Sequence, residues 1–169
     1  IDDGIKDNTK SELEIMVAKY KRRIFFIPAP EPSEVFQFPF KSRYQMGHSY
    51  MRMCIGSLLP EDVHRVLCLD SDTLVLGDVE ELWNLEMGDN VLAGVADCVN
   101  VKAFTRQFML EDSDIYCNAG MFLVNLDAWR NYQMEDNIRQ TIKEHSGNIF
   151  FFEQTLMNYV CKEKIIKLE

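Results

Sequence analysis

The stretch of sequence that decides the fold is Arg65-Val66-Leu67-Cys68-Leu69-Asp70-Ser71-Asp72-Thr73-Leu74-Val75, a short apolar run that ends in two carboxylates one residue apart. The apolar run predicts a buried strand. If the chain stays extended, Asp70 and Asp72 point to the same face of the strand. Two like charges at that spacing repel, and a hard divalent cation such as Mg²⁺ or Mn²⁺ is the usual compensation. The alternative interpretation of the motif is an exposed acidic turn.

Strands and helices alternate on both sides of this motif. A capping box at Ser11-Glu12-Leu13-Glu14 predicts the start of the first helix, and Asp127 is the expected N-cap of a long one. The expected elements are a helix over 11–19, a strand over 24–27, a helix over 49–59, strands over 66–69, 91–96 and 115–126, helices over 79–83, 127–144 and 153–160, and a strand from 164. This alternation predicts a layered α/β domain with a largely parallel sheet.

The composition describes one acidic globular domain. The chain has 169 residues, 47% of them hydrophobic and 27% charged, and a net charge of −9, which argues against a nucleic-acid-binding surface. No apolar run approaches the roughly 20 residues of a membrane span. The cysteines are odd in number and lack C-x-x-C spacing, which favours a reducing compartment over a disulfide framework. They are Cys54, Cys68, Cys98, Cys117 and Cys161.

The sequence contains no dinucleotide fingerprint, no P-loop and no nucleophile elbow, so these classes of site are not indicated. Three other groups of residues carry potential chemistry. The first is Asp70 with Asp72. The second is Asn118-Ala119-Gly120, whose small residues let a ligand approach the backbone; a bulged strand is the alternative interpretation. The third is Glu153-Gln154 at the start of a helix, suited to a polyhydroxylated ligand or simply to the helix dipole.

In their order and spacing these segments resemble the family 8 glycosyltransferases, which include bacterial lipopolysaccharide galactosyl- and glucosyltransferases and glycogenin. The helix Ser49-Tyr50-Met51-Arg52-Met53 is similar to the family's Y-x-R-L motif, and Leu69-Asp70-Ser71-Asp72-Thr73-Leu74-Val75 to its metal motif. Tyr116-Cys117-Asn118-Ala119-Gly120, with Asn125-Leu126 and Trp129-Arg130, resembles its N-A-G segment.

The resemblance implies a GT-A fold and metal-dependent, retaining transfer of galactose or glucose from a UDP-sugar to a saccharide acceptor such as lipopolysaccharide core. Asp70 and Asp72 would hold Mn²⁺ (or Mg²⁺) and the diphosphate. The other donor-binding residues would be Arg52, Asp70, Ser71, Asp97, Asn118, Ala119 and Gly120. Glu153 and Gln154 stand where the family usually has D-Q, beside the anomeric carbon, so Glu153 is a departure from the family pattern.

The chain starts without methionine and stops within a predicted strand, so we expect it to be the central part of a longer protein, a single incomplete catalytic domain over residues 1–169. By resemblance, the uracil-binding strand would precede Ile1 and a metal-binding histidine would follow Glu169. We therefore expect these residues alone to be inactive. The whole protein would be cytoplasmic, with room for peripheral attachment to the inner membrane through a basic C-terminal tail.

Two alternatives stay open. One is a non-catalytic nucleotide-sugar-binding relative, for which Glu153 in place of aspartate is the sequence support. The other is a haloacid-dehalogenase-type phosphatase, which also begins with a strand and D-x-D. In that class the next threonine or valine falls two positions after the second aspartate, whereas Thr73 directly follows Asp72.

Overall fold

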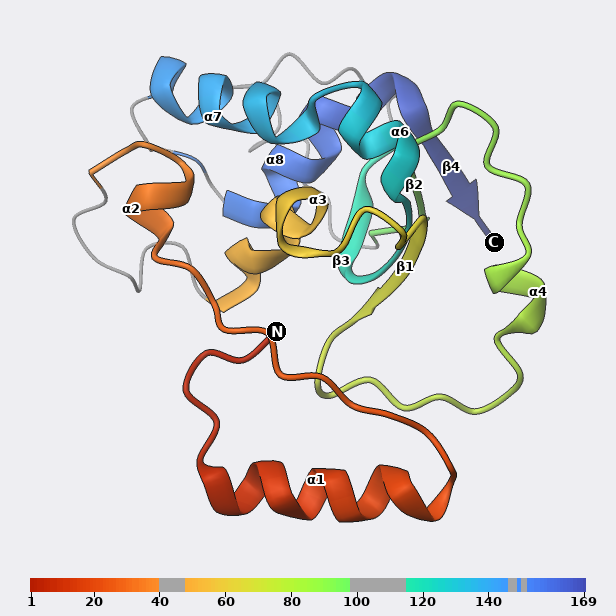
Figure 1. The fold of residues 1–169 in the computed structure, drawn as a ribbon. Helices are drawn as coiled ribbons and strands as arrows, with labels where there is room; N and C mark the ends of the chain where they lie inside the picture. The colour runs from red at the N-terminus through yellow and green to blue at the C-terminus, as the bar shows by residue number, and fades with distance from the viewer. Residues whose placement is uncertain (40–47, 98–114, 146–148, 150–151) are drawn as a thin grey trace.

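A mixed β-sheet forms the centre of the molecule (Figure 1). The structure is a computed structural model that describes residues 1–39, 48–97, 115–145, 149 and 152–169. Among these residues, four strands form one sheet in the order β1-β3-β2-β4. The strands are β1 (Arg65–Leu69), β2 (Leu92–Ala96), β3 (Cys117–Asn125) and β4 (Ile165–Leu168). The predicted α/β class is confirmed, and each of these strands lies within two residues of its predicted bounds.

The prediction of a largely parallel sheet is wrong for β3. This strand runs antiparallel to both β1 and β2, whereas β2 and β4 are parallel. The Asp97 N–H donates to the carbonyl oxygen of Tyr116 over 2.8 Å, so β3 begins beside the end of β2 and runs back along it. An antiparallel neighbour needs no crossover helix, and the hydrophobic pattern of a strand does not reveal its direction.

Helices pack mainly against one face of this sheet (Figure 1). The helical segments are α1 (Asp7–Lys19), α2 (Pro32–Val35), η2 (His48–Cys54), α3 (Ile55–Leu58), α4 (Glu80–Trp83), α6 (Leu126–Asn131), α7 (Met134–Glu144), α8 (Phe152–Cys161) and η4 (Lys162–Lys164). The predicted helix over 49–59 is thus a 3-10 helix followed by one α-turn, and it ends before Pro60 as expected. None of the helices in the described residues has the length and hydropathy needed to cross a bilayer.

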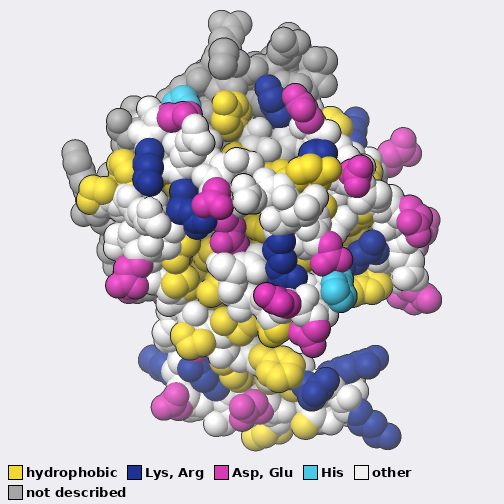
Figure 2. Space-filling view, turned by 45° about the horizontal axis from the view of Figure 1, so that its top comes forward, with side chains coloured by type: hydrophobic (Ala, Val, Ile, Leu, Met, Phe, Trp, Pro, Cys, Tyr) yellow, Lys and Arg dark blue, Asp and Glu magenta, His cyan; other side chains and the backbone are white. Residues whose placement is uncertain are grey.

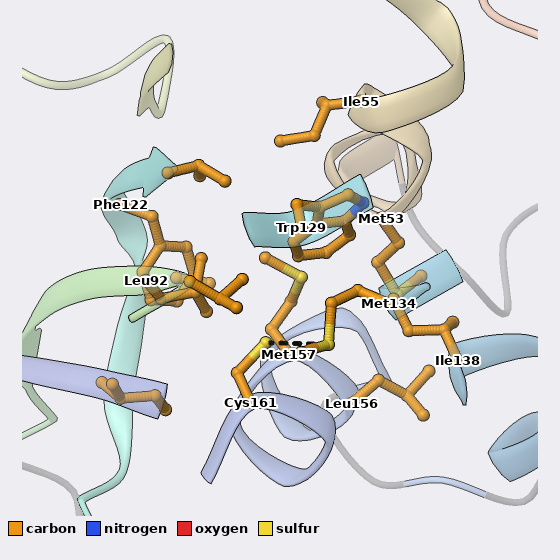
Figure 3. Packing of buried hydrophobic residues seen from close by; sticks show 14 of the residues in the cluster. Met53, Ile55, Leu92, Phe122, Trp129, Met134, Ile138, Leu156, Met157 and Cys161 are labelled. Carbon is orange, nitrogen blue, oxygen red and sulfur yellow. Dashed lines mark hydrogen bonds between the residues drawn. The ribbon is translucent and has the colours of Figure 1, made fainter. Parts of the chain in front are cut away.

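The main core lies between the sheet and α6, α7 and α8 (Figure 3). Trp129, Phe122 and Leu92 are fully or almost fully buried there, and the sulfur atoms of Met134 and Cys161 lie 4.0 Å apart. A second, smaller cluster around Met87 and Leu123 covers the other face of the sheet. The alternation of strand side chains divides β3 between the two clusters, which fixes its register.

The N-terminal segment differs most from the expectations. Helix α1 begins at Asp7, four residues before the predicted capping box, and buries none of its residues. The sequence pattern places Leu13, Met16, Val17 and Tyr20 on one apolar face, but Met16 is 53% and Tyr20 74% exposed. Residues 24–27 form no strand, and Phe25 is 70% exposed. Figures 1 and 2 show α1 as a separate lobe below the body of the molecule. Local sequence signals therefore predicted this helix, but its apolar face is not buried against the rest of the described structure.

The predicted helix over 127–144 is two helices. The N-cap of α6 is Asn125, whose side chain accepts a hydrogen bond from the Ala128 N–H over 3.2 Å, and not Asp127. Gln133 adopts a left-handed backbone conformation with φ of 52°, and this ends one helix and begins the next. The hydrophobic pattern of this segment predicts that Trp129, Met134, Ile138 and Ile142 face inward, and all four are buried.

Candidate active site

Side chains from five elements meet at one edge of the sheet. Arg52 comes from η2, Asp70 follows β1, and Asp97 follows β2. The segment Asn118-Ala119-Gly120 lies at the start of β3, and Glu153 with Gln154 opens α8. Hydrogen bonds connect members of all five elements, as described below. The structure therefore brings most of the predicted site residues together.

The start of β3 is irregular, and this irregularity frees backbone groups for the site. The register between β2 and β3 shifts, with Gly94 opposite Phe122 but Ala96 opposite Cys117, so the residues between them bulge away from β2. The Ala119 N–H donates instead to Gln154 Oε1 over 2.9 Å, and the Gly120 N–H to Asn118 Oδ1 over 2.7 Å. The bulge that was the alternative interpretation of this segment is thus present, and it is part of the site.

Gly120 lies against the first aspartate of the D-x-D motif. A Cβ atom at this position would lie 2.8 Å from Asn118 Oδ1 and 3.3 Å from Asp70 Oδ2. The Asp70 N–H also donates to the Gly120 carbonyl oxygen over 2.9 Å, which extends the β1–β3 ladder by one residue. A larger residue here would push Asn118 or Asp70 from its place, so the absence of a side chain at Gly120 makes room for these two site residues.

Arg52 is the centre of the charged network. Its guanidinium donates to Asp70 Oδ1, to the Ala119 carbonyl oxygen, and to Glu153 Oε1 over 3.3 Å. The side chains of Arg52 and Glu153 are 15% and 7% exposed, and that of Asp70 is 45% exposed. Burial opposes the charge of Arg52 most strongly, but the hydrogen bond to Asp70 and the charge of Glu153 together outweigh it and raise the pKa of Arg52. Arg52 thus remains a cation between two carboxylates.

The Asp97 carboxylate accepts hydrogen bonds from two side-chain amides. Its Oδ2 accepts hydrogen bonds from Gln154 Nε2 over 2.8 Å and from Asn118 Nδ2 over 3.3 Å. Gln154 therefore uses both ends of its amide, the oxygen for Ala119 and the nitrogen for Asp97. Asn118 remains exposed. The arrangement presents carboxylate and amide groups at one surface, the chemistry that suits sugar hydroxyls.

The D-x-D motif itself lies in a turn, so the expectation that Asp70 and Asp72 continue an extended strand is wrong. Strand β1 ends at Leu69, and the Thr73 N–H donates to the Asp70 carbonyl oxygen over 3.1 Å. Ser71 and Asp72 are exposed, and Ser71 lines the same cavity as Arg52 and Asp70. The turn begins where the β1–β3 ladder ends, at the hydrogen bond from the Asp70 N–H to Gly120.

Within the described residues, no group of three or more His, Cys, Asp or Glu side chains is arranged to hold a metal ion. The donors that are present, Asp70 and Asp72, are hard oxygen ligands two residues apart. Such a partial set fits Mg²⁺ or Mn²⁺, which commonly takes one or two carboxylates together with phosphate oxygens. Asp72 is the more accessible of the two, because Asp70 is held by Arg52.

A cavity of about 680 Å³ lies beside Arg52 and Asp70. Apolar side chains of β1 and the neighbouring segments form much of its wall, among them Ile27, Met51 and Val66. Cys68 also lines it, and burial raises the pKa of this thiol to about 11. Burial likewise raises the pKa of Cys117 to about 11, so neither thiol is a nucleophile near neutral pH. Cys98 lies outside the described residues.

Two supporting residues, Asn158 and Arg130, received no role in the sequence analysis. Asn158 is 0% exposed and its amide contacts the backbone of β3. Arg130 donates to backbone carbonyl oxygens in α3 and in the segment that joins α3 to β1. These acceptors are Gly56 (3.0 Å), Leu59 (3.0 Å), Pro60 (2.9 Å), Glu61 (3.3 Å) and Val63 (3.0 Å). The spacing of Asn158 four residues after Gln154, on one helix face, was the available signal.

The chain is similar in sequence to two longer bacterial proteins. The chain is 25% identical over 171 residues to general stress protein A of Bacillus subtilis, covering 99% of this chain and 59% of that protein. It is 26% identical over 168 residues to a putative glycosyltransferase of Haemophilus influenzae, covering 98% of this chain and 50% of that protein. The chain thus spans between half and three fifths of the length of these relatives.

Solved structures share the fold. The galactosyltransferase LgtC, solved in complex with donor and acceptor sugar analogs, matches with a TM-score of 0.85 and 24% identity over 100% of this chain and 61% of that one. The glycosyltransferase GlyE of Streptococcus pneumoniae matches with a TM-score of 0.67 and 22% identity over 99% of this chain and 36% of that one. These likenesses confirm the expected GT-A fold.

The sequence profile gives the family directly. Glycosyl transferase family 8 matches residues 1–169, which include the Arg52 helix, the D-x-D turn, the start of β3 and the first turn of α8. The chain therefore belongs to glycosyl transferase family 8.

Proposed function

We propose that the full-length protein is a metal-dependent retaining glycosyltransferase, which moves galactose or glucose from a UDP-sugar to a saccharide acceptor. The observation that carries the proposal is the Arg52 network, which joins Asp70 of the D-x-D turn to Glu153 of α8 at one edge of the sheet. Family membership supports the reaction class. A lipopolysaccharide-type acceptor, a cytoplasmic location and peripheral attachment to the inner membrane are parts of the same proposal.

The diphosphate of the donor would lie at the D-x-D turn and Arg52. Asp70 and Asp72 would hold Mn²⁺ or Mg²⁺, which when bound neutralises the negative charge that develops on the departing UDP. Arg52 supplies a further fixed positive charge beside Asp70, and Ser71 offers a hydroxyl on the same exposed turn. Because Arg52 already lies between carboxylates, it needs little reorganisation when the diphosphate arrives.

The sugar would lie toward Asp97, Asn118 and α8. The Asp97 carboxylate and the Asn118 amide can exchange hydrogen bonds with sugar hydroxyls. Ala119 and Gly120, which lie between these groups and Asp70, belong to the same proposed donor site. The oxygens of Glu153 and Gln154 would stabilise the positive charge of the oxocarbenium-like sugar. Gln154 Oε1 accepts one hydrogen bond from Ala119 and keeps a second lone pair for this purpose.

Donor turnover tests the proposal. The full-length protein is incubated with Mn²⁺ and either UDP-galactose or UDP-glucose, and UDP release and the anomeric configuration of the product are followed by NMR. We expect turnover of at least one donor with retention, and a loss of about 100-fold in Gln154→Ala. Asp89→Asn, an exposed turn residue remote from the site residues in sequence, is the matched control. An inverted product would contradict the retaining mechanism.

Tight UDP-sugar binding without turnover would favour the second candidate, a non-catalytic binding relative. The specific observation behind this candidate is that Glu153, longer than the usual aspartate, lies against Arg52 and is 7% exposed. The phosphatase alternative has no support from the family match. Turnover by the wild type distinguishes the two candidates. Glu153→Asp tests the role of the longer side chain, since it should create turnover in a binding protein whose glutamate is what prevents transfer, and should keep turnover in an enzyme.

A further inference from the structure

The buried amide of Asn158 joins α8 to the first residue of β3. Its Oδ1 accepts a hydrogen bond from the Cys117 N–H over 2.6 Å, and its Nδ2 donates to the Cys117 carbonyl oxygen over 2.8 Å. Nδ2 also donates to the carbonyl oxygen of Gln154 over 2.8 Å. The side chain is 0% exposed, yet its oxygen and its nitrogen are both hydrogen-bonded. An amide buried in this way costs free energy unless it is fully paired, so its partners are specific.

Asn158 takes the place of a missing strand neighbour. Because the Asp97 N–H pairs with Tyr116, the next residue, Cys117, turns its N–H and C=O away from β2. On that other side β1 ends at Leu69, and its ladder with β3 stops where Asp70 meets Gly120. Within the described residues, the Asn158 amide is the group that hydrogen-bonds to both the backbone N–H and the backbone carbonyl oxygen of Cys117.

The contacts of Asn158 and Gln154 repeat along the two elements. Asn158 binds Cys117, and Gln154, one helical turn earlier, binds Ala119, two strand residues later. Four helix residues rise about 6 Å and two strand residues about 6.6 Å, so the two spacings match. A shift of α8 along β3 would break both contacts together.

We propose that Asn158 is a positioning residue, which sets the register of α8 against β3 and so holds Gln154 and Glu153 at the reacting centre. Its effect on turnover rests on the proposed function, whereas its effect on the position of Gln154 does not. Asn158 itself does not contact the surface where the sugar would lie, because it is fully buried one turn further along α8.

Two variants of the full-length protein separate positioning from general stability. Asn158→Leu keeps the approximate volume but removes all three hydrogen bonds. Met157→Ala is the matched control, because Met157 is the preceding residue of the same helix, is equally buried and belongs to the apolar core. Amide hydrogen exchange is measured at Cys117 and Ala119, and kcat and KM for the UDP-sugar are measured alongside. If Asn158→Leu does not fold, Asn158→Asp, which keeps the acceptor for the Cys117 N–H, replaces it.

For the Asn158 variant we expect exchange at both Cys117 and Ala119 to be at least about tenfold faster than in the control. We also expect kcat to fall by about 100-fold while the donor KM changes by less than about threefold, because misplaced groups affect the reaction more than ground-state binding. Unchanged protection at Ala119, or an equal loss of kcat in the control, would overturn the proposal. If no variant and not even the wild type turns over a donor, the proposed function fails, and the exchange data still decide whether Asn158 positions Gln154.

Discussion

Removal of Arg52 should destabilise the protein mainly through Glu153. In Arg52→Met the Glu153 carboxylate, 7% exposed, loses the guanidinium that lies 3.3 Å from it. Loss of one partner from a buried ion pair typically costs about 3–5 kcal/mol. The 3.3 Å separation is longer than in a strong charge-assisted hydrogen bond, and Asp70 is 45% exposed and so contributes little. We therefore expect the free energy of unfolding to fall by about 3 kcal/mol, the lower end of that range.

A double-mutant cycle isolates this term. In a Glu153→Gln background no buried charge is left behind, so Arg52→Met should cost only about 1 kcal/mol there, which gives a coupling energy of about 2 kcal/mol. Urea unfolding at pH 7, followed by circular dichroism, measures all four proteins. A coupling energy below about 0.5 kcal/mol would refute the reasoning, because it would mean that Arg52 does not compensate the buried charge of Glu153.

Three further predictions concern the surroundings of the site. Gly120→Ala should lower donor turnover by at least about tenfold, because its Cβ would meet Asn118 and Asp70, whereas Gly77→Ala, where a Cβ meets nothing, should leave turnover unchanged. Arg130→Met should lower the free energy of unfolding by about 2 kcal/mol, since it removes the donors to five carbonyl oxygens; a change below about 0.5 kcal/mol in urea unfolding would contradict this. The pKa of Cys117 is raised on folding from 9.0 to about 11, so its contribution to stability is present below pH 9 and is lost as the pH rises through about 11. Urea unfolding at pH 8 and pH 10.5 should therefore show a steeper loss in the wild type than in Cys117→Ala, and equal losses would exclude this linkage.

The residues of the candidate site could be predicted from the sequence because they occur in short motifs at characteristic spacings. Arg52, Asp70, Gly120 and Gln154 do lie together, although they are far apart in the chain. The shape of the D-x-D segment could not be predicted in the same way. An apolar pattern indicates where a strand is, but it does not indicate where the pairing of β1 with β3 ends, which is where the turn after Leu69 begins.

The direction of β3 and the break between α6 and α7 could not be predicted from local sequence patterns. Direction follows from the pairing of Asp97 with Tyr116, a tertiary contact that leaves no mark on hydrophobic periodicity. The left-handed conformation of Gln133 is unusual for a residue other than glycine, so the residue type does not indicate that the helix breaks there. Asn125 and Asp127 are both good N-caps by residue type, and only the structure selects Asn125.

The most direct test of the proposed donor site is a calorimetric titration of UDP into the full-length protein, with and without Mn²⁺. Asp72→Asn is titrated in parallel, with Asp89→Asn as the control for loss of an exposed carboxylate. A metal-dependent diphosphate site at the D-x-D turn predicts that UDP binds only with Mn²⁺ and at least about tenfold more weakly to the Asp72 variant. UDP binding that needs neither Mn²⁺ nor Asp72 would contradict that site.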